Sequence, residues 1–269
     1  MTAATAALPA ESARSNWLTV ASIGIVACLA ADMVHEALGH GTASLLTHDP
    51  VLSLSTVAVQ NALPSRIVSA AGTSANCIVG ALSFLLLRRA TTFSPGACFL
   101  WLFGAFNLLN SGYLVVSAFT NNGDWANVIF DLSPAWLWRC GVGLAGAIVY
   151  YLSVRWAVIL MIRLIERTGV ALADLWRLIL PAYLSGGMVM TIAAVFNPIS
   201  PSLILLSGAG ASFGLNAGLL FVPGFVSDNA RTQSIEPHPL RFSLFWFFLA
   251  VFSAGFFIAV LGPGIHFSR

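Results

Sequence analysis

The sequence predicts an all-α polytopic membrane protein: a bundle of about seven transmembrane helices with a short β-like segment after the first span. Two observations lead to this fold class. Of the 269 residues, 58% are hydrophobic and only 8% are charged, at a mean hydropathy of +0.87, which leaves too little polar surface for a soluble globule. The apolar residues also gather into runs of spanning length. We therefore expect an integral protein of a bacterial plasma membrane.

Each of the apolar runs approaches the roughly 20 residues that a transmembrane helix needs. The runs lie at residues 17–46, 65–87, 97–120, 135–162, 175–197, 203–222 and 242–262. The first is too long for the apolar region of a signal peptide, so we expect a retained span after a polar tail at 1–16. Pro181 interrupts the fifth run. Without a fixed-period repeat or a long linker, residues 17–269 are expected to form a single membrane domain.

Two shorter patterns add detail to the predicted bundle. After the helix-breaking His48-Asp49-Pro50, residues 52–60 alternate in polarity and are rich in β-branched side chains. This pattern predicts a short strand or hairpin near the membrane surface. In the sixth run, Gly210, Gly214 and Gly218 recur at four-residue steps, which predicts a close helix–helix contact.

The charges indicate topology and exclude nucleic-acid binding. All basic residues other than histidine are arginines, and most flank the apolar runs, so the expected partner is the lipid bilayer and not a nucleic acid. By the positive-inside rule, their asymmetry places the N-terminus in the cytoplasm and the far end of the first span toward the outer side. Arginines on the N-terminal side are Arg14, Arg88, Arg89, Arg163, Arg167, Arg177, Arg231 and Arg241, against Arg66, Arg139 and Arg269 on the other side.

The stretch His35-Glu36-Ala37-Leu38-Gly39-His40, inside the first apolar run, carries the chemistry. Zinc hydrolases commonly use His-Glu-x-x-His, with the glutamate as general base. Here the histidines are five residues apart, which in a regular α-helix leaves them roughly 140° from each other. A π-bulge would bring them together, and Gly39 would ease that distortion. We expect such a bulge and a metal site on His35 and His40.

A regular helix would give a different arrangement and a different function. Asp32, Glu36 and His40 would then lie at four-residue steps on one face, a row typical of proton or ion paths. The alternative function is thus a proton- or ion-coupled transporter. A third possibility is a non-catalytic membrane protein that keeps the fold.

The third apolar run ends near a candidate third ligand, Asp124. A zinc site with two histidines commonly adds a carboxylate and leaves the fourth position for water; the alternative for Asp124 is an ordinary turn residue after Gly123. Asn76 in the second run needs an interhelical partner inside the membrane. Asn107 and Asn110 share one face of the third run. Two asparagines on one face of a spanning helix are more than packing usually requires.

Taken in order, these features resemble the core of the site-2 protease family of intramembrane zinc metalloproteases. The resemblance covers residues 17–130, a protease-like core, and leaves 131–269 as additional spans. It rests on the His-Glu motif, the β-like segment, Ala71-Gly72-Thr73-Ser74-Ala75-Asn76 and the asparagines before Gly123-Asp124. The six-residue motif alone also resembles the His-Glu-x-x-Gly-His signature of dipeptidyl-peptidase III. The histidine spacing, Thr73 after Gly72, and Trp125 after Asp124 depart from the site-2 pattern.

The site-2 resemblance implies a function and a site. Zinc would be held by His35, His40 and Asp124, Glu36 would activate the water, and Asn76, Asn107 and Asn110 would lie near the substrate path. The expected activity is hydrolysis of a peptide bond in a membrane-protein or peptide substrate, with Glu36 as general base. Members of this family usually place the site toward the cytosol, opposite to the side that the arginines indicate.

Overall fold

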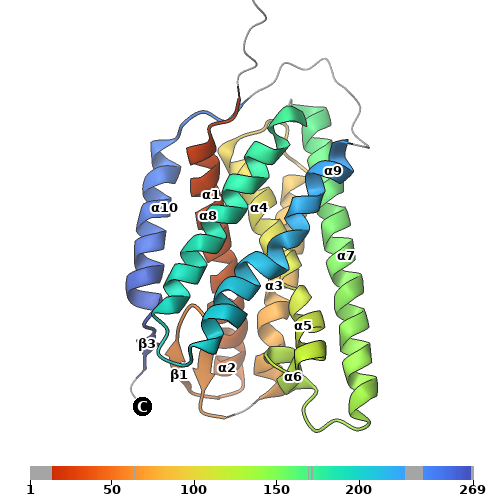
Figure 1. Cartoon of the computed structure of the whole chain (residues 1–269), viewed down its shortest axis with the longest axis vertical. Coiled ribbons are helices and arrows are strands. Elements are labelled where there is room, and N and C mark those ends of the chain that lie inside the picture. The colour runs from red at the N-terminus through yellow and green to blue at the C-terminus, as the bar shows by residue number, and fades with distance from the viewer. Residues whose placement is uncertain (1–13, 64, 169, 171, 228–238, 268–269) are drawn as a thin grey trace, which may run out of the picture.

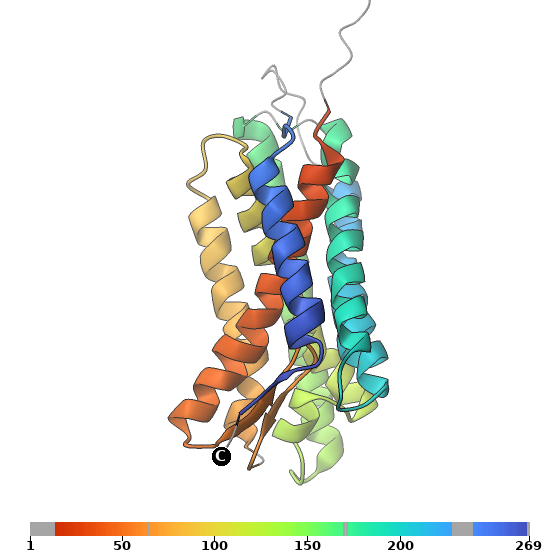
Figure 2. The same ribbon diagram turned by 90° about the vertical axis from the view of Figure 1, so that its left-hand side faces the viewer.

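The computed structural model describes residues 14–63, 65–168, 170, 172–227 and 239–267. Its seven long apolar helices confirm the predicted fold class. They lie side by side, with the start of the described chain at one end of the bundle and its described end at the other (Figures 1 and 2). Residues 1–13 of the expected polar tail lie outside the described residues. The spans are Trp17–Leu46, Arg66–Leu87, Pro95–Thr120, Ala135–Thr168, Leu175–Val195, Ile204–Val226 and Leu244–Leu261.

Four of the spans change their helical winding or break along their length. The first consists of α1 (Trp17–Met33), the π-helical η1 (Val34–Gly41) and α2 (Thr42–Leu46); the third of α4 (Pro95–Leu109) and α5 (Gly112–Thr120). The sixth consists of the π-helical η3 (Ile204–Gly214), the 3₁₀-helical η4 (Leu215–Phe221) and α9 (Val222–Ser227); the seventh of α10 (Leu244–Phe256) and the π-helical η5 (Phe257–Leu261). The other helices are α3 (Arg66–Leu87), α6 (Asp124–Val128), α7 (Ala135–Thr168), η2 (Leu172–Asp174) and α8 (Leu175–Val195).

The first three spans begin where the sequence provides a capping side chain. The side chains of Asn16, Ser65 and Ser94 accept hydrogen bonds from backbone N–H groups of the first turns of α1, α3 and α4. Such caps satisfy N–H groups that have no partner within the helix. Pro95 occupies the first turn of α4, where a missing N–H is tolerated. Pro181, by contrast, lies inside α8, which continues through it.

A small sheet forms at the end of the bundle opposite the start of α1. β1 (Val51–Leu54) and β2 (Val59–Asn61) form an antiparallel hairpin, which confirms the predicted β-like segment. β3 (Ile265–His266), from the far end of the chain, pairs with the other edge of β1. The strand order β2-β1-β3 leaves β2 at an edge.

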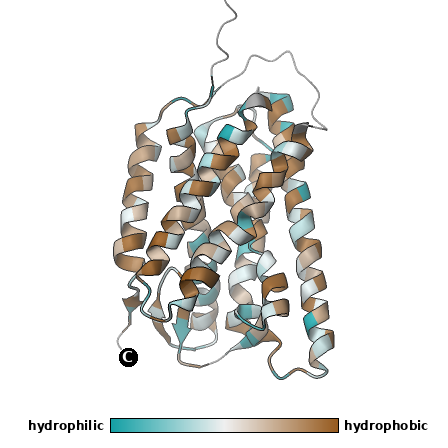
Figure 3. Cartoon of the chain, in the orientation of Figure 1, coloured by the Kyte–Doolittle hydropathy of each residue, from teal (hydrophilic) through white to brown (hydrophobic). Residues whose placement is uncertain are grey.

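α1 is the central helix, packed between α4, α8 and α10. Its apolar side chains belong to one continuous core with those of α4, α7 and α8. The outward face of the bundle is also apolar, as Figure 3 shows; Phe245, Phe248 and Phe252 on α10 are 63–74% exposed. Such a surface is suited to a lipid bilayer.

The predicted glycine contact in the sixth span is wrong for two of its three members. A Cβ atom at Gly218 would meet Tyr150, Val154 and Leu109, whereas one at Gly214 would meet nothing within 4 Å and one at Gly210 would meet only the preceding turn. The reason is the winding, because four-residue steps stay on one face only in a regular α-helix, and this span is π-helical and then 3₁₀-helical.

Candidate metal centre

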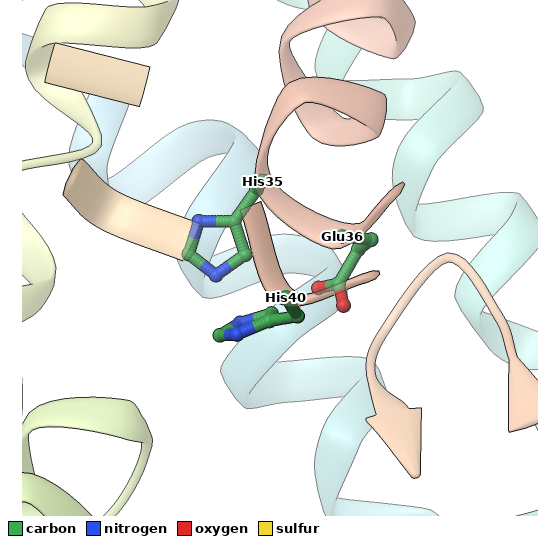
Figure 4. Close-up of side chains that lie close together, drawn as sticks. All are labelled: His35, Glu36 and His40. Carbon is green, nitrogen blue, oxygen red and sulfur yellow. The ribbon is translucent and has the colours of Figure 1, made fainter. Parts of the chain in front are cut away.

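A π-helical turn brings the two histidines together. η1 spans Val34–Gly41, and in this wider winding residues five apart face the same side. The ring centroids of His35 and His40 are 4.7 Å apart, with the rings at 83° to each other. Figure 4 shows the two imidazoles lying together on one side of the turn. The π-bulge expected from the five-residue spacing is therefore confirmed.

Two glycines let α3 pack directly against this turn. A Cβ atom at Gly39 would lie 2.6 Å from the Cα atom of Gly72, a separation that real Cβ atoms do not adopt. A Cβ atom at Gly72 would lie 2.6 Å from Nε2 of His40 and 2.7 Å from Nε2 of His35. The backbone of α3 thus forms a floor beneath both imidazoles, and only glycine leaves room for them.

The Nδ1 atom of His35 is fixed by a buried asparagine. It lies 2.7 Å from Oδ1 of Asn76. The amide nitrogen of Asn76 donates to the carbonyl of Ala31 and to Oδ1 of Asn107, at 2.9 and 2.8 Å. Oδ1 of Asn76 is therefore the acceptor and Nδ1–H of His35 the donor, which in a neutral imidazole leaves the lone pair on Nε2.

His40 is oriented in the same way by a backbone group. Its Nδ1 atom lies 2.7 Å from the carbonyl oxygen of Val68 in α3, and because a carbonyl can only accept, Nδ1–H donates. Hydrogen bonding of one ring nitrogen to an oxygen acceptor is the usual support of a metal-binding histidine, because it presents the other nitrogen as a ligand. The Nε2 atoms of His35 and His40 are therefore both available as ligands.

The two Nε2 atoms converge on Asp124, the first residue of α6. Oδ2 of Asp124 lies 3.0 Å from Nε2 of His35 and 3.4 Å from Nε2 of His40. Burial raises the pKa of this carboxyl, but imidazoles protonated at Nε2 donate hydrogen bonds and place positive charge beside it, which outweighs burial and holds its pKa below the usual range. When both imidazoles are neutral, their Nε2 lone pairs and the carboxylate are free for a cation. Ligands on a zinc ion with bonds of 2.0–2.1 Å are about 3.3 Å apart in a tetrahedron, so the observed separations match a shared metal.

Glu36 lies beside the histidines and is 6% exposed. One ligand atom from each of His35, Glu36 and His40 lies within 4.8 Å of the others. Figure 4 shows the Glu36 carboxylate next to His40, on the side of the β1–β2 hairpin. Among the described residues, its Oε2 atom has no hydrogen-bond partner. Burying a carboxylate oxygen without a partner costs free energy. The Oε2 atom of Glu36 is thus available to a group in the adjoining cavity.

That cavity has a volume of about 270 Å³ and is bounded by η1, the hairpin, α3, α5 and α6. Its walls include His35, Glu36, His40 and Asp124, together with Val59 at the β2 edge. Further polar groups line it that the motifs in the sequence did not single out, among them Tyr113 and Ser207. The ring centroids of Tyr113 and His35 are 5.6 Å apart. Neither residue stands in a pattern that would have predicted this, because the third span breaks between Asn110 and Tyr113 and Ser207 belongs to no motif.

None of the three asparagines expected near the substrate path lines this cavity. Asn76 and Asn107 are fully buried and bond to His35, to each other and to helix carbonyls; neither lines the 270 Å³ cavity. They support His35 from behind. Asn110 lines a separate, smaller cavity.

Asp32, Glu36 and His40 do not form the continuous row that a regular helix would give. Asp32 faces the same small cavity as Asn110, whereas Glu36 and His40 face the larger one. The π-helical winding of η1 is the cause, because it rotates Glu36 and His40 relative to α1.

Two imidazole nitrogens and a carboxylate oxygen, with a second carboxylate alongside, form a donor set that suits zinc in hydrolytic sites. Protein-family models, curated proteins and solved structures were all compared with the chain, and none matches. The fold and the site thus define a polytopic membrane protein with a buried candidate metal centre near one end of its bundle.

Proposed function

We propose that this chain is an intramembrane zinc metallopeptidase of the site-2 protease type. His35, His40 and Asp124 would hold the metal, and Glu36 would act as general base. One observation carries the proposal: two imidazoles with fixed Nδ1 atoms direct both Nε2 atoms at one carboxylate oxygen, at 3.0 and 3.4 Å. Metal-binding histidines almost always donate their other ring N–H to an oxygen acceptor in this way.

Zinc bound at these three residues would supply a Lewis acid that polarises a peptide carbonyl and acidifies a water. The chain supplies the proton transfers. Glu36, whose Oε2 atom has no partner among the described residues, takes a proton from the water as its oxygen bonds to the carbonyl carbon. The same carboxyl then gives that proton to the leaving amine as the C–N bond breaks. Hydrolysis consumes one water and leaves Glu36 ionised again.

The substrate would enter as an extended segment along the β2 edge. β2 is an edge strand, and Val57, Ala58, Val59 and Asn61 of the hairpin line the cavity beside Glu36. An unwound stretch of a membrane protein or peptide can add to such an edge through main-chain hydrogen bonds. With the N-terminus placed in the cytoplasm by the arginines, this would occur toward the outer side.

The experiment compares wild type with Glu36→Gln in detergent-purified protein. Zinc is measured by plasma mass spectrometry, and hydrolysis is measured with fluorescein-labelled casein and a reconstituted transmembrane peptide. We expect about one zinc per chain in both proteins and a loss of hydrolysis of roughly 10²–10⁴-fold in Glu36→Gln. Glu166→Gln, the same chemical change at the other end of the bundle in α7, is the matched control and should keep both properties.

Each contrary result has a defined meaning. Hydrolysis retained in Glu36→Gln excludes Glu36 as the base. Zinc in wild type without hydrolysis of either substrate favours the non-catalytic membrane protein. If the wild-type protein carries no zinc after zinc is added back, the proposed metal centre is rejected, and proton-coupled transport would be assayed next.

A further inference from the structure

A second polar site lies deeper in the bundle, behind the metal centre. It is a cavity of about 40 Å³ whose walls include Asp32 from α1, Asn110 from the third span, and Ser212 and Asn216 from the sixth. About 10–15 Å³ of such volume is enough to hold one water, so the cavity has room for a dehydrated ion or for more than one water. The remaining walls are largely apolar, with Cys28 as a weak donor.

Three buried acceptors in this cavity are left unpaired. Among the described residues, Oδ2 of Asp32, Oδ1 of Asn110 and Oδ1 of Asn216 have no hydrogen-bond partner. Asn216 is only 6% exposed, and its amide nitrogen is already used in a 3.0 Å bond to the carbonyl of Ser212. Its oxygen is therefore the atom that faces the cavity. Buried acceptors left unpaired in this way point to a water or an ion that pairs with them.

The three residues also sit at discontinuities of their spans. Asp32 is the second-last residue of α1, just before η1 begins; Asn110 lies between α4 and α5, and Asn216 is the second residue of η4, after the change from η3. Irregular backbone at membrane depth is tolerated where it is buried or lines a cavity, and broken helices recur at ion sites in membranes. Three independent breaks meeting at one cavity point to a bound ligand.

We propose that this cavity binds a dehydrated sodium ion through Asp32, Asn110 and Asn216. Waters could pair with the three acceptors but would leave the buried Asp32 carboxylate without a counter-charge, whereas a cation is coordinated by all three. No basic residue is found among the described residues that line the cavity, so the cation would also neutralise the Asp32 carboxylate, and the nearest other carboxylate, Glu36, has the same sign. This inference does not depend on the proposed peptidase function.

The donor set selects the kind of ion. Carboxylate and amide oxygens suit hard cations and not zinc. One negative charge matches a monovalent ion, and the small volume favours sodium over potassium.

The test is the thermal stability of the full chain in detergent. Sodium chloride is replaced by potassium or choline chloride at constant ionic strength, with the same zinc loading throughout. We expect sodium to raise Tm in a saturable manner, by roughly 4–8 °C at thirty times the dissociation constant, and potassium and choline to have little effect. Equal Tm values in the three salts would overturn the proposal and favour a protonated Asp32 with a water.

Variants locate the effect, and radioactive ²²Na⁺ binding measures it directly. Asp32→Asn should abolish both the Tm shift and ²²Na⁺ binding. Asp131→Asn, the same chemical change at an exposed position, is the control and should preserve both. Asn110→Ala and Asn216→Ala should each raise the half-saturating sodium concentration about tenfold, which keeps the test decisive if Asp32→Asn does not fold. A sodium response unchanged in these two variants would contradict the proposed ligands.

Because the readouts are stability and sodium binding, failure here is distinguishable from failure of the peptidase proposal, which is read from zinc content and hydrolysis.

Discussion

Two π-helical stretches, η1 and η3, show what a distorted helix needs in order to form a site. η1 carries two histidines and a glutamate, whereas η3 (Ile204–Gly214) has no ionisable side chain. In η1, Gly39 meets the backbone of α3 at Gly72. In η3, the close approach is at Gly208, where a Cβ atom would lie 2.6 Å from Cβ of Ala194 in α8, whereas one at Gly214 would meet nothing within 4 Å. The π winding and a closely packed neighbouring helix are common to both stretches. The donor set, fixed by groups of that neighbouring helix, belongs to η1 alone.

The largest expected effect is the loss of metal when a ligand is removed. The binding free energy of a structural zinc site with four ligands is about 10–16 kcal/mol. Each ligand therefore contributes roughly 3–4 kcal/mol on average, or about 10²–10³-fold in affinity. We expect this loss for His35→Ala, His40→Ala and Asp124→Ala, measured as bound zinc during competition with a chelator. His266→Ala, an exposed histidine of β3, should change nothing. Zinc retained in Asp124→Ala would return Asp124 to the role of a turn residue.

A methyl group at Gly72 should disrupt the floor of the site. In Gly72→Ala the Cβ atom would lie 2.6–2.7 Å from both imidazoles, so the helices must move apart. Overpacking of this kind destabilises by about 1–3 kcal/mol. We expect a lower Tm together with weaker zinc binding. An unchanged Tm and unchanged zinc affinity would show that the contact between η1 and α3 does not fix the histidines.

Removing the support behind His35 should have a smaller effect. Asn76→Ala deletes the acceptor of Nδ1–H, and loss of such a support typically lowers metal affinity by about 10–100-fold. Asn76→Asp keeps an acceptor and should retain more affinity than Asn76→Ala, as measured by zinc competition. Equal affinities in the two variants would indicate that the hydrogen bond does not orient the ring.

The smallest effect is expected in η3. Gly214 has helical dihedral angles and open space around it, so Gly214→Ala should be neutral or stabilising by up to about 1 kcal/mol. The measurement is Tm, alongside that of Gly72→Ala. If Gly214→Ala were as destabilising as Gly72→Ala, the difference between the two π-helical stretches would not hold.

Local sequence determined much of this protein. The number of spans followed from apolar runs, because a bilayer requires about 20 apolar residues per helix. The strand-like alternation at residues 52–60 gave the hairpin. The five-residue histidine spacing pointed to the π-helical turn, since only a wider winding places both imidazoles on one side.

Tertiary structure decided which groups meet. The Nδ1 acceptors of the histidines come from α3, and β3 joins the sheet from the other end of the chain. The sequence suggested Asp124 but left a turn residue as the alternative; only the packing of α6 against α3 and α5 brings its carboxylate to both Nε2 atoms. Packing likewise directed Asn76 to His35, with Asn107 bonded to Asn76, and placed Asn110 in one cavity with Asp32. Hydropathy and spacing are local along the chain, whereas these contacts depend on where several helices cross.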